Sequence, residues 1–203
     1  MKIISISLDS EIFPVSWKGA VAIPLPKKLE VDSWFKNLCP MSISAYISKL
    51  PEHAVFNQIH VHIVWSGLYP SISAHHQHHS TERVLVKVAN DILLNMNSQR
   101  VTLLVLLDFS AAFDLMDNGI LLRRLSTRFG IDRRALEWFS SYLLGRGQHI
   151  LFNRVKSGTF DLRFSVPQRG RLGPLLLVVY ASKPFEAIQA HLPDTHCFAD
   201  DTQ

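Results

Sequence analysis

Apolar residues recur at the three- and four-residue spacing of an amphipathic helix in several parts of the chain. Val84, Val88 and Ile92 would share one face of the first such helix. Gly130 would separate two later helices, and Gly145 would end the second of them. The predicted helices cover residues 81–96, 119–129, 132–144 and 175–190.

Short apolar or alternating runs predict strands elsewhere. Residues 101–107 are β-branched and leucine residues without interruption, the pattern of a fully buried strand, and this run ends at Asp108. Residues 196–199 lead into Asp200 and Asp201 in the same way. Further strands are predicted over residues 21–25, 149–155 and 159–164, the last two joined by a turn at 157–158, while the rest of residues 1–50 favours loops and short extended pieces.

The composition is that of a folded globular protein. The chain has 203 residues, of which 47% are hydrophobic and 19% charged, which argues against disorder, collagen and coiled coil. Cys39 and Cys197 lie far apart without a disulfide or zinc-finger spacing, so we expect no disulfide-linked partner. No apolar run is long enough to cross a bilayer, and no targeting signal is seen. We expect an intracellular protein of the cytoplasm or nucleus, without a membrane partner.

Positive charge is concentrated in the middle of the chain. The net charge is +4, but residues 118–171 contain eleven basic residues and three acidic ones, which leaves about −4 for the rest. Such a density attracts polyanions through counterion release. The alternative interpretation is a solvated face of two arginine-rich helices.

Three aspartates at the ends of apolar runs are the main candidates for chemistry. Asp108, Asp200 and Asp201 are hard oxygen ligands, which suit Mg²⁺. Two such ions can align an attacking 3′-hydroxyl and a leaving pyrophosphate, so the pattern favours nucleotidyl transfer. Alternatively, each aspartate simply caps a turn.

Four motifs in order resemble the reverse transcriptase (RNA-directed DNA polymerase) of non-LTR, LINE-, jockey- or CR1-like retrotransposons. They read LLVLLDFSAAFDLMDNGILLRRL, WFSSYLLGRGQ, VPQRGRLGPLLLVVY and FADDTQ, and the likeness covers about residues 20–203. The resemblance implies an α+β fold with an antiparallel palm sheet packed against helices. It also implies a partial fingers region over residues 1–100, with an irregular N-terminus, and a palm over residues 101–203 that ends at the FADD turn without a thumb.

The resemblance also implies roles for individual residues. Asp108, Asp200 and Asp201 would bind two Mg²⁺ ions, together with the Phe109 carbonyl. Phe113 would act as a steric gate against ribose. The remaining implied nucleotide contacts are Gln168, Lys27 and Lys28, and the partners would be an RNA template, a DNA primer and deoxynucleoside triphosphates. We expect the nucleic acid to meet basic residues of the central helices and their end, namely Arg123, Arg124, Arg133, Arg134 and Arg146.

The chain departs from the family pattern at two positions that bear on activity. The usual GVPQGSVLGP reads SVPQRGRLGP, which places Arg169 where a glycine lets the backbone approach the nucleotide. Cys39 stands where an arginine should clamp the triphosphate. These changes and the missing thumb predict an impaired enzyme.

Three alternatives stay open beside the polymerase. The first is a catalytically dead remnant that at most binds nucleic acid through its basic helices. The second is an unrelated Mg²⁺ phosphotransferase, which would leave the VPQ segment unexplained. The third concerns a local site, a zinc ion bound by the histidines of residues 75–79. No cysteine or carboxylate motif accompanies these histidines, so the other interpretation is a diverged loop.

Overall fold

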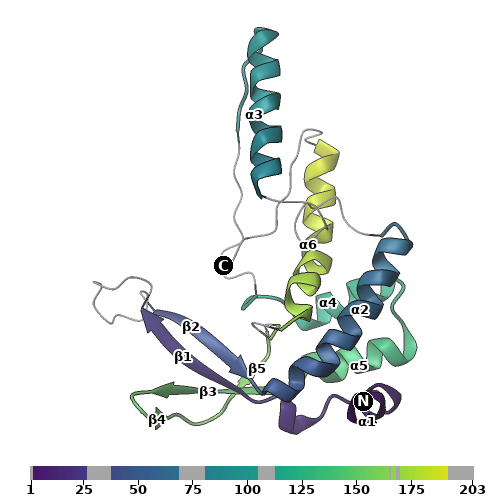
Figure 1. Cartoon of the computed structure of the whole chain (residues 1–203), viewed down its shortest axis with the longest axis vertical. Coiled ribbons are helices and arrows are strands. Elements are labelled where there is room, and N and C mark those ends of the chain that lie inside the picture. The colour runs from purple at the N-terminus through teal and green to yellow at the C-terminus, as the bar shows by residue number, and fades with distance from the viewer. Residues whose placement is uncertain are drawn as a thin grey trace.

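A computed structural model describes residues 2–26, 38–68, 81–104, 113–164, 166–167 and 170–191. In these ranges the chain forms α-helices, two short 3₁₀ helices and one small sheet (Figure 1). The helices are α1 (Lys2–Asp9), η1 (Val15–Trp17), η3 (Tyr46–Ser48), α2 (Lys49–Trp65), α3 (Thr81–Asn97), α4 (Asn118–Thr127), α5 (Arg133–Leu143) and α6 (Leu172–His191). The strands are β1 (Ala20–Pro26), β2 (Leu38–Ser44), β3 (Arg146–Phe152), β4 (Val155–Lys156) and β5 (Phe160–Leu162).

The sheet is mixed rather than purely antiparallel. Its strand order is β2-β1-β3-β4, and β5 also pairs with β3. β1 and β3 run parallel, because the chain passes through the helical region between them, whereas every other pair is antiparallel. The described elements are compatible with the α+β class, and the sheet that they form is mixed. Residues 105–107 and 196–199, which belong to the strands expected for the antiparallel palm sheet, lie outside the described residues.

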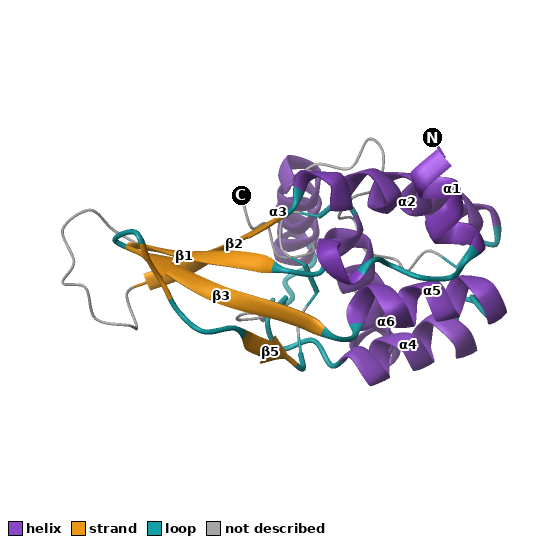
Figure 2. Cartoon of the chain, turned by 90° about the horizontal axis from the view of Figure 1, so that it is seen from below, coloured by secondary structure: helices purple, strands orange, loops and turns teal. Residues whose placement is uncertain are grey.

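Helices α1, α2, α4, α5 and α6 gather into a body with its own core, and the sheet extends to one side of that body (Figure 2). Helix α3 stands apart from it (Figure 1). Phe13 is fully buried at the centre of an aromatic group, with its ring edge-on to Trp17, Trp138 and Tyr142 at centroid distances of 5.6, 5.7 and 5.0 Å. Such edge-to-face contacts add to the free energy gained by burying the rings. Buried leucine and valine residues of α4 and α6 continue this core.

All four predicted helices are confirmed within a few residues. α3, α4, α5 and α6 correspond to the four predicted segments. Gly130 and Gly145 have φ values of 64° and 65°, the left-handed conformation that glycine adopts easily at the end of a helix. The strand expected over residues 21–25 is β1.

Three expectations about local structure are wrong in the described residues. The N-terminal segment contains helix α1, which packs against α5 through a hydrogen bond from Trp138 Nε1 to Ser7 Oγ of 3.2 Å. Residues 101–104 form no strand, since no described strand pairs with them. Val101, at the start of this segment, is 99% exposed. The strand predicted over residues 149–155 is interrupted by a tight turn at Asn153 and Arg154.

No helix in the described part of the chain is both long enough and apolar enough to cross a membrane.

Candidate functional site

Most residues to which the sequence assigns chemistry lie outside the described ranges. These are the three aspartates with Phe109, the nucleotide-contacting Gln168 and both lysines, namely Asp108, Asp200, Asp201, Phe109, Gln168, Lys27 and Lys28. The histidines of residues 75–79, residues 196–199 and Arg169 also lie outside them. Within the described residues, no group of three or more histidine, cysteine, aspartate or glutamate side chains is placed to hold a metal ion.

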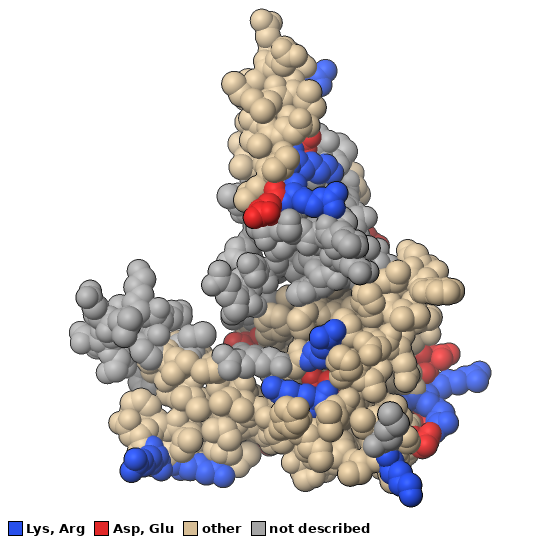
Figure 3. All heavy atoms as spheres, viewed as in Figure 1, with Lys and Arg blue, Asp and Glu red and all other residues tan. Residues whose placement is uncertain are grey.

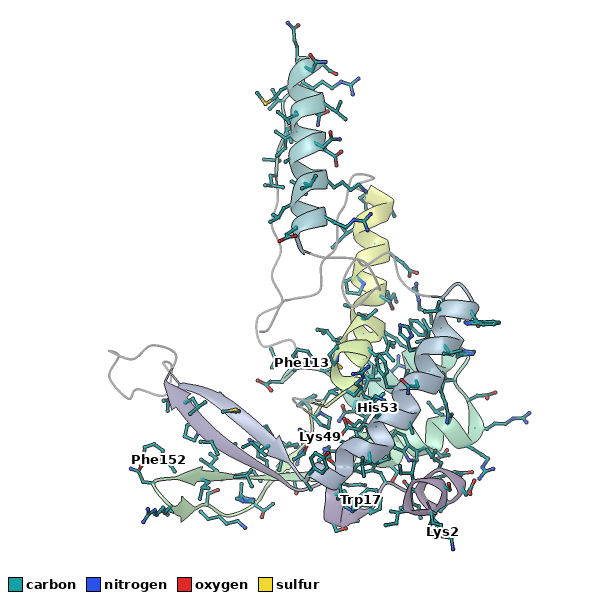
Figure 4. All side chains as sticks on the ribbon, viewed as in Figure 1. Lys2, Trp17, Lys49, His53, Phe113 and Phe152 are labelled. Atoms are coloured by element: carbon teal, nitrogen blue, oxygen red, sulfur yellow. The ribbon has the colours of Figure 1, made fainter. Side chains whose placement is uncertain are left out.

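Phe113 is the one predicted nucleotide contact inside the described residues, and it lies against the segment that follows VPQ in the sequence (Figure 4). The backbone N–H of Val166 donates to the Phe113 carbonyl at 3.2 Å. A Cβ atom at Gly173, in the first turn of α6, would lie 3.6 Å from Cε1 of the Phe113 ring and 3.4 Å from the Pro167 carbonyl. Two motifs about fifty residues apart thus meet at the start of α6.

The same segment is held at its other end by a buried carboxylate. Glu52 on α2 is fully buried, and its Oε2 accepts a hydrogen bond of 3.0 Å from the backbone N–H of Arg171. A Cβ atom at Gly170 would overlap this oxygen and lie 3.1 Å from Cδ of Glu52. Val166 is therefore anchored to Phe113, and Arg171 is anchored to α2.

Tyr142 and Arg146 surround the Glu52 carboxylate with further buried polar groups. Their exposed fractions are 0% and 3%, and Arg146 Nη1 donates to the Tyr142 carbonyl at 2.7 Å. The Arg146 guanidinium also lies over the Tyr142 ring, 5.1 Å from its centroid. Among the described residues Glu52 Oε1, Tyr142 Oη and Arg146 Nη2 have no partner in hydrogen-bond geometry. We call Glu52, Tyr142 and Arg146 the buried cluster.

Burial dominates the electrostatics of the cluster. It raises the pKa of the Glu52 carboxyl, an effect opposed by Arg146, the Arg171 amide, the Tyr142 hydroxyl and Lys49. Burial, reinforced by the Glu52 charge, also raises the pKa of Tyr142 well above its ordinary value. The pKa of Arg146 is lowered by burial, and Tyr142 and Glu52 act in the opposite direction. Each charge in the cluster therefore depends on its neighbours.

A pH dependence of stability follows from the Glu52 pKa. The folded value is raised above the ordinary 4.5, so the folded chain binds more protons than the unfolded chain between these two values. The part of the stability that comes from protonation of Glu52 is complete below pH 4.5 and is lost as the pH rises through the raised value. Glu52→Gln removes the carboxyl group that titrates. As the pH is lowered, the unfolding free energy of the wild type should therefore rise relative to that of the variant.

This dependence is measured by urea unfolding of both proteins across the acidic and neutral pH range. A difference that stays constant with pH would show that Glu52 does not titrate anomalously.

The five arginines predicted to bind nucleic acid differ in the burial and the partners of their guanidinium groups. Arg146 belongs to the buried cluster. Arg134 donates to Glu11 Oε1 at 2.9 Å, and Arg124 stacks 4.9 Å from the centroid of the Tyr180 ring. Arg123 and Arg133 are exposed and, among the described residues, form no ion pair or ring contact.

Sequence reasoning missed Glu52 and Tyr142. The signal for Glu52 was present, because positions 52, 55, 59 and 63 share one face of α2 and the other three are buried Val55, Ile59 and Ile63. A carboxylate that continues an apolar stripe is expected to be buried and partnered. Tyr142 gave no comparable signal, since an aromatic residue at an apolar position of a helix is ordinary.

Comparison with known proteins gives one distant relative. No family model matches the chain. Over 176 residues, 86% of its length, the chain is 24% identical to a probable RNA-directed DNA polymerase from transposon BS of Drosophila melanogaster. The chain spans 19% of that protein. This similarity supports a distant relationship to reverse transcriptases and leaves the retrotransposon subtype open.

Proposed function

We propose that the chain is the fingers and palm portion of an RNA-directed DNA polymerase of a non-LTR retrotransposon, with fingers over residues 1–100 and palm over residues 101–203. The structural observation that supports this proposal most directly is the contact of Phe113 with Val166 and Gly173, since it joins the two motifs that would form a nucleotide site. The distant transposon polymerase relative supports the same function.

The proposed chemistry is transfer of a deoxynucleotide to a primer 3′-hydroxyl. Asp108, Asp200 and Asp201 would hold two Mg²⁺ ions, which supply charge neutralisation to the attacking and leaving oxygens. Their carboxylates are a donor set that suits this hard cation. The carbonyl of Phe109 would complete the set.

Other residues of the chain would bind and select the nucleotide. The ring of Phe113 would exclude a ribose 2′-hydroxyl by steric contact, and Gln168 would lie against the base pair that forms. Lys27 and Lys28 would meet the triphosphate as cations. On the surface of the helices, Arg123 and Arg133 have the exposure needed to contact template or primer phosphates.

A catalytically impaired remnant is the second candidate, favoured by Arg169 and Cys39. A long cation at position 169 would take space that a glycine leaves to the nucleotide. The loss of an arginine at position 39 removes a charge-assisted contact to phosphate. This form would still bind nucleic acid through its basic surface.

The two candidates make different predictions for Asp108→Ala. In a working polymerase this change should lower incorporation of labelled dTTP on poly(A)/oligo(dT) by about a thousandfold or more and abolish Mg²⁺-dependent nucleotide binding. Asp161→Ala, which removes an exposed aspartate on β5, serves as the matched control and should leave both unchanged.

Incorporation and equilibrium nucleotide binding are measured on the full chain with and without Mg²⁺. Wild-type incorporation equal to that of Asp108→Ala, and nucleotide binding indifferent to the metal, would establish the remnant instead.

A further inference from the structure

The β3–β4 hairpin ends in a two-residue turn with an unusual residue in it. Asn153 and Arg154 have φ values of 47° and 64°, and they join Phe152 and Val155, which pair directly across the strands. A two-residue turn with both φ values positive strongly favours glycine at its second position. Arg154 occupies that position at a conformational cost that glycine would avoid, and it places an exposed guanidinium at the tip of the hairpin.

Two exposed aromatic rings lie on the strands that carry this turn, one on β3 and one on β5. Phe152 is 53% exposed and Phe160 is 56% exposed. Because Phe160 pairs with Gln148, and residues 148 and 152 point to the same side of β3, both rings lie on one face of the sheet. Figure 4 shows Phe152 at the free end of the sheet, away from the helical body.

The cations of the hairpin are free of ion pairs within the described residues. Arg154 and Lys156 are exposed, and no described acid lies within salt-bridge distance of either. By contrast, Arg128 and Arg134 on the helical body pair with Glu186, Glu11 and Asp9. Figure 3 shows the basic atoms of the hairpin gathered at the end of the molecule farthest from the helices.

We propose that a single strand of nucleic acid binds across this hairpin. Its phosphates would contact Arg154 at the tip of the hairpin, and its bases would stack on Phe152 and Phe160. Lys156 pairs with Leu151 and therefore lies on the opposite face, where it adds only to the positive potential of the hairpin. Unpaired cations beside exposed rings are the combination by which proteins bind single strands without reading their sequence. The inference rests on the proposed function and adds to it a second contact surface, apart from the helices.

The test uses the full chain and fluorescein-labelled oligonucleotides of about 20 nucleotides, one of RNA and one of DNA, which distinguish a template from a displaced strand. Binding is followed by anisotropy over a range of salt concentrations. Arg154→Gly should keep or raise the melting temperature, because glycine adopts the positive φ value more easily. It should weaken binding about threefold or more. The slope of log K against log salt concentration should fall by about one phosphate contact. Lys2→Ala, on α1, removes one exposed charge far from the hairpin and should change neither.

A second pair of variants tests the rings. Phe152→Ala should weaken binding about tenfold, and Phe152→Tyr should restore it, because tyrosine also presents a flat aromatic face. Wild-type affinity in both Arg154→Gly and Phe152→Ala, with binding by the wild type intact, would overturn the hairpin surface and leave the proposed function standing. No binding of either oligonucleotide by the wild type at low salt would overturn both. Loss of a dimer in Phe152→Ala, seen by sedimentation, would make the hairpin a protein interface instead.

Discussion

Glu52→Ala should lower the free energy of unfolding by about 3 kcal/mol, because it removes a buried carboxylate that accepts a hydrogen bond and whose negative charge favours the charged form of Arg146. Arg146 is 3% exposed, so solvent cannot replace the lost carboxylate. The backbone N–H of Arg171 loses its acceptor in the same step. Both losses fall on groups that the fold has already removed from water, where an unpaired polar group costs most.

Urea unfolding measures this change, with Glu137→Ala as the matched control. Glu137 is an exposed glutamate on α5, so its removal should change stability by less than about 0.5 kcal/mol. The double variant Glu52→Met, Arg146→Met should recover most of the loss, because neither charge then remains unpaired. Equal effects of Glu52→Ala and Glu137→Ala would mean that the buried cluster does not contribute to stability.

The sequence predicted the helices after residue 80 well because their signals are local. Spacing of apolar residues and stop signals such as Gly145 depend on near neighbours alone, and α3, α4, α5 and α6 begin and end close to their predicted positions. Helix α2 escaped prediction for the opposite reason. Val55, Ile59 and Ile63 recur at helical spacing, but the other valines, the phenylalanine and the histidines on the other faces of α2 obscure this stripe in the sequence. Packing of the stripe into the helical core stabilises the helix.

The strand predictions failed where pairing decided the outcome. Residues 101–104 have the composition of a buried strand, but composition does not supply a partner strand. In the β3–β4 hairpin, Asn153 and Arg154 form a turn that contains no glycine, so the usual signal was absent. The buried cluster could be predicted only in part. Glu52 can be recognised because it lies at helical spacing from buried apolar residues, but its contact with the Arg171 amide depends on the packing of segments that are distant in the sequence.

The close approach of Gly170 to Glu52 makes Gly170→Ala the most informative single change near the VPQ segment. The added methyl group would overlap Glu52 Oε2, and the buried carboxylate has little room to move, since its neighbours are Tyr142 and Arg146. We expect a loss of about 3 kcal/mol in unfolding free energy, from crowding and from the weakened hydrogen bond of the Arg171 amide. Gly170 has no positive φ value, so backbone strain does not contribute.

A double-mutant cycle distinguishes steric overlap with Glu52 from destabilisation that any substitution at position 170 would cause. In the Glu52→Ala background the obstructing carboxylate is gone, so Gly170→Ala should then cost little, with a coupling of about 2 kcal/mol between the two changes. Gly19→Ala is the control glycine, because open space surrounds its position. Additive effects of Gly170→Ala and Glu52→Ala would show that Glu52 does not anchor this segment. Strong coupling would establish that α2 positions the chain beside Phe113 through one carboxylate.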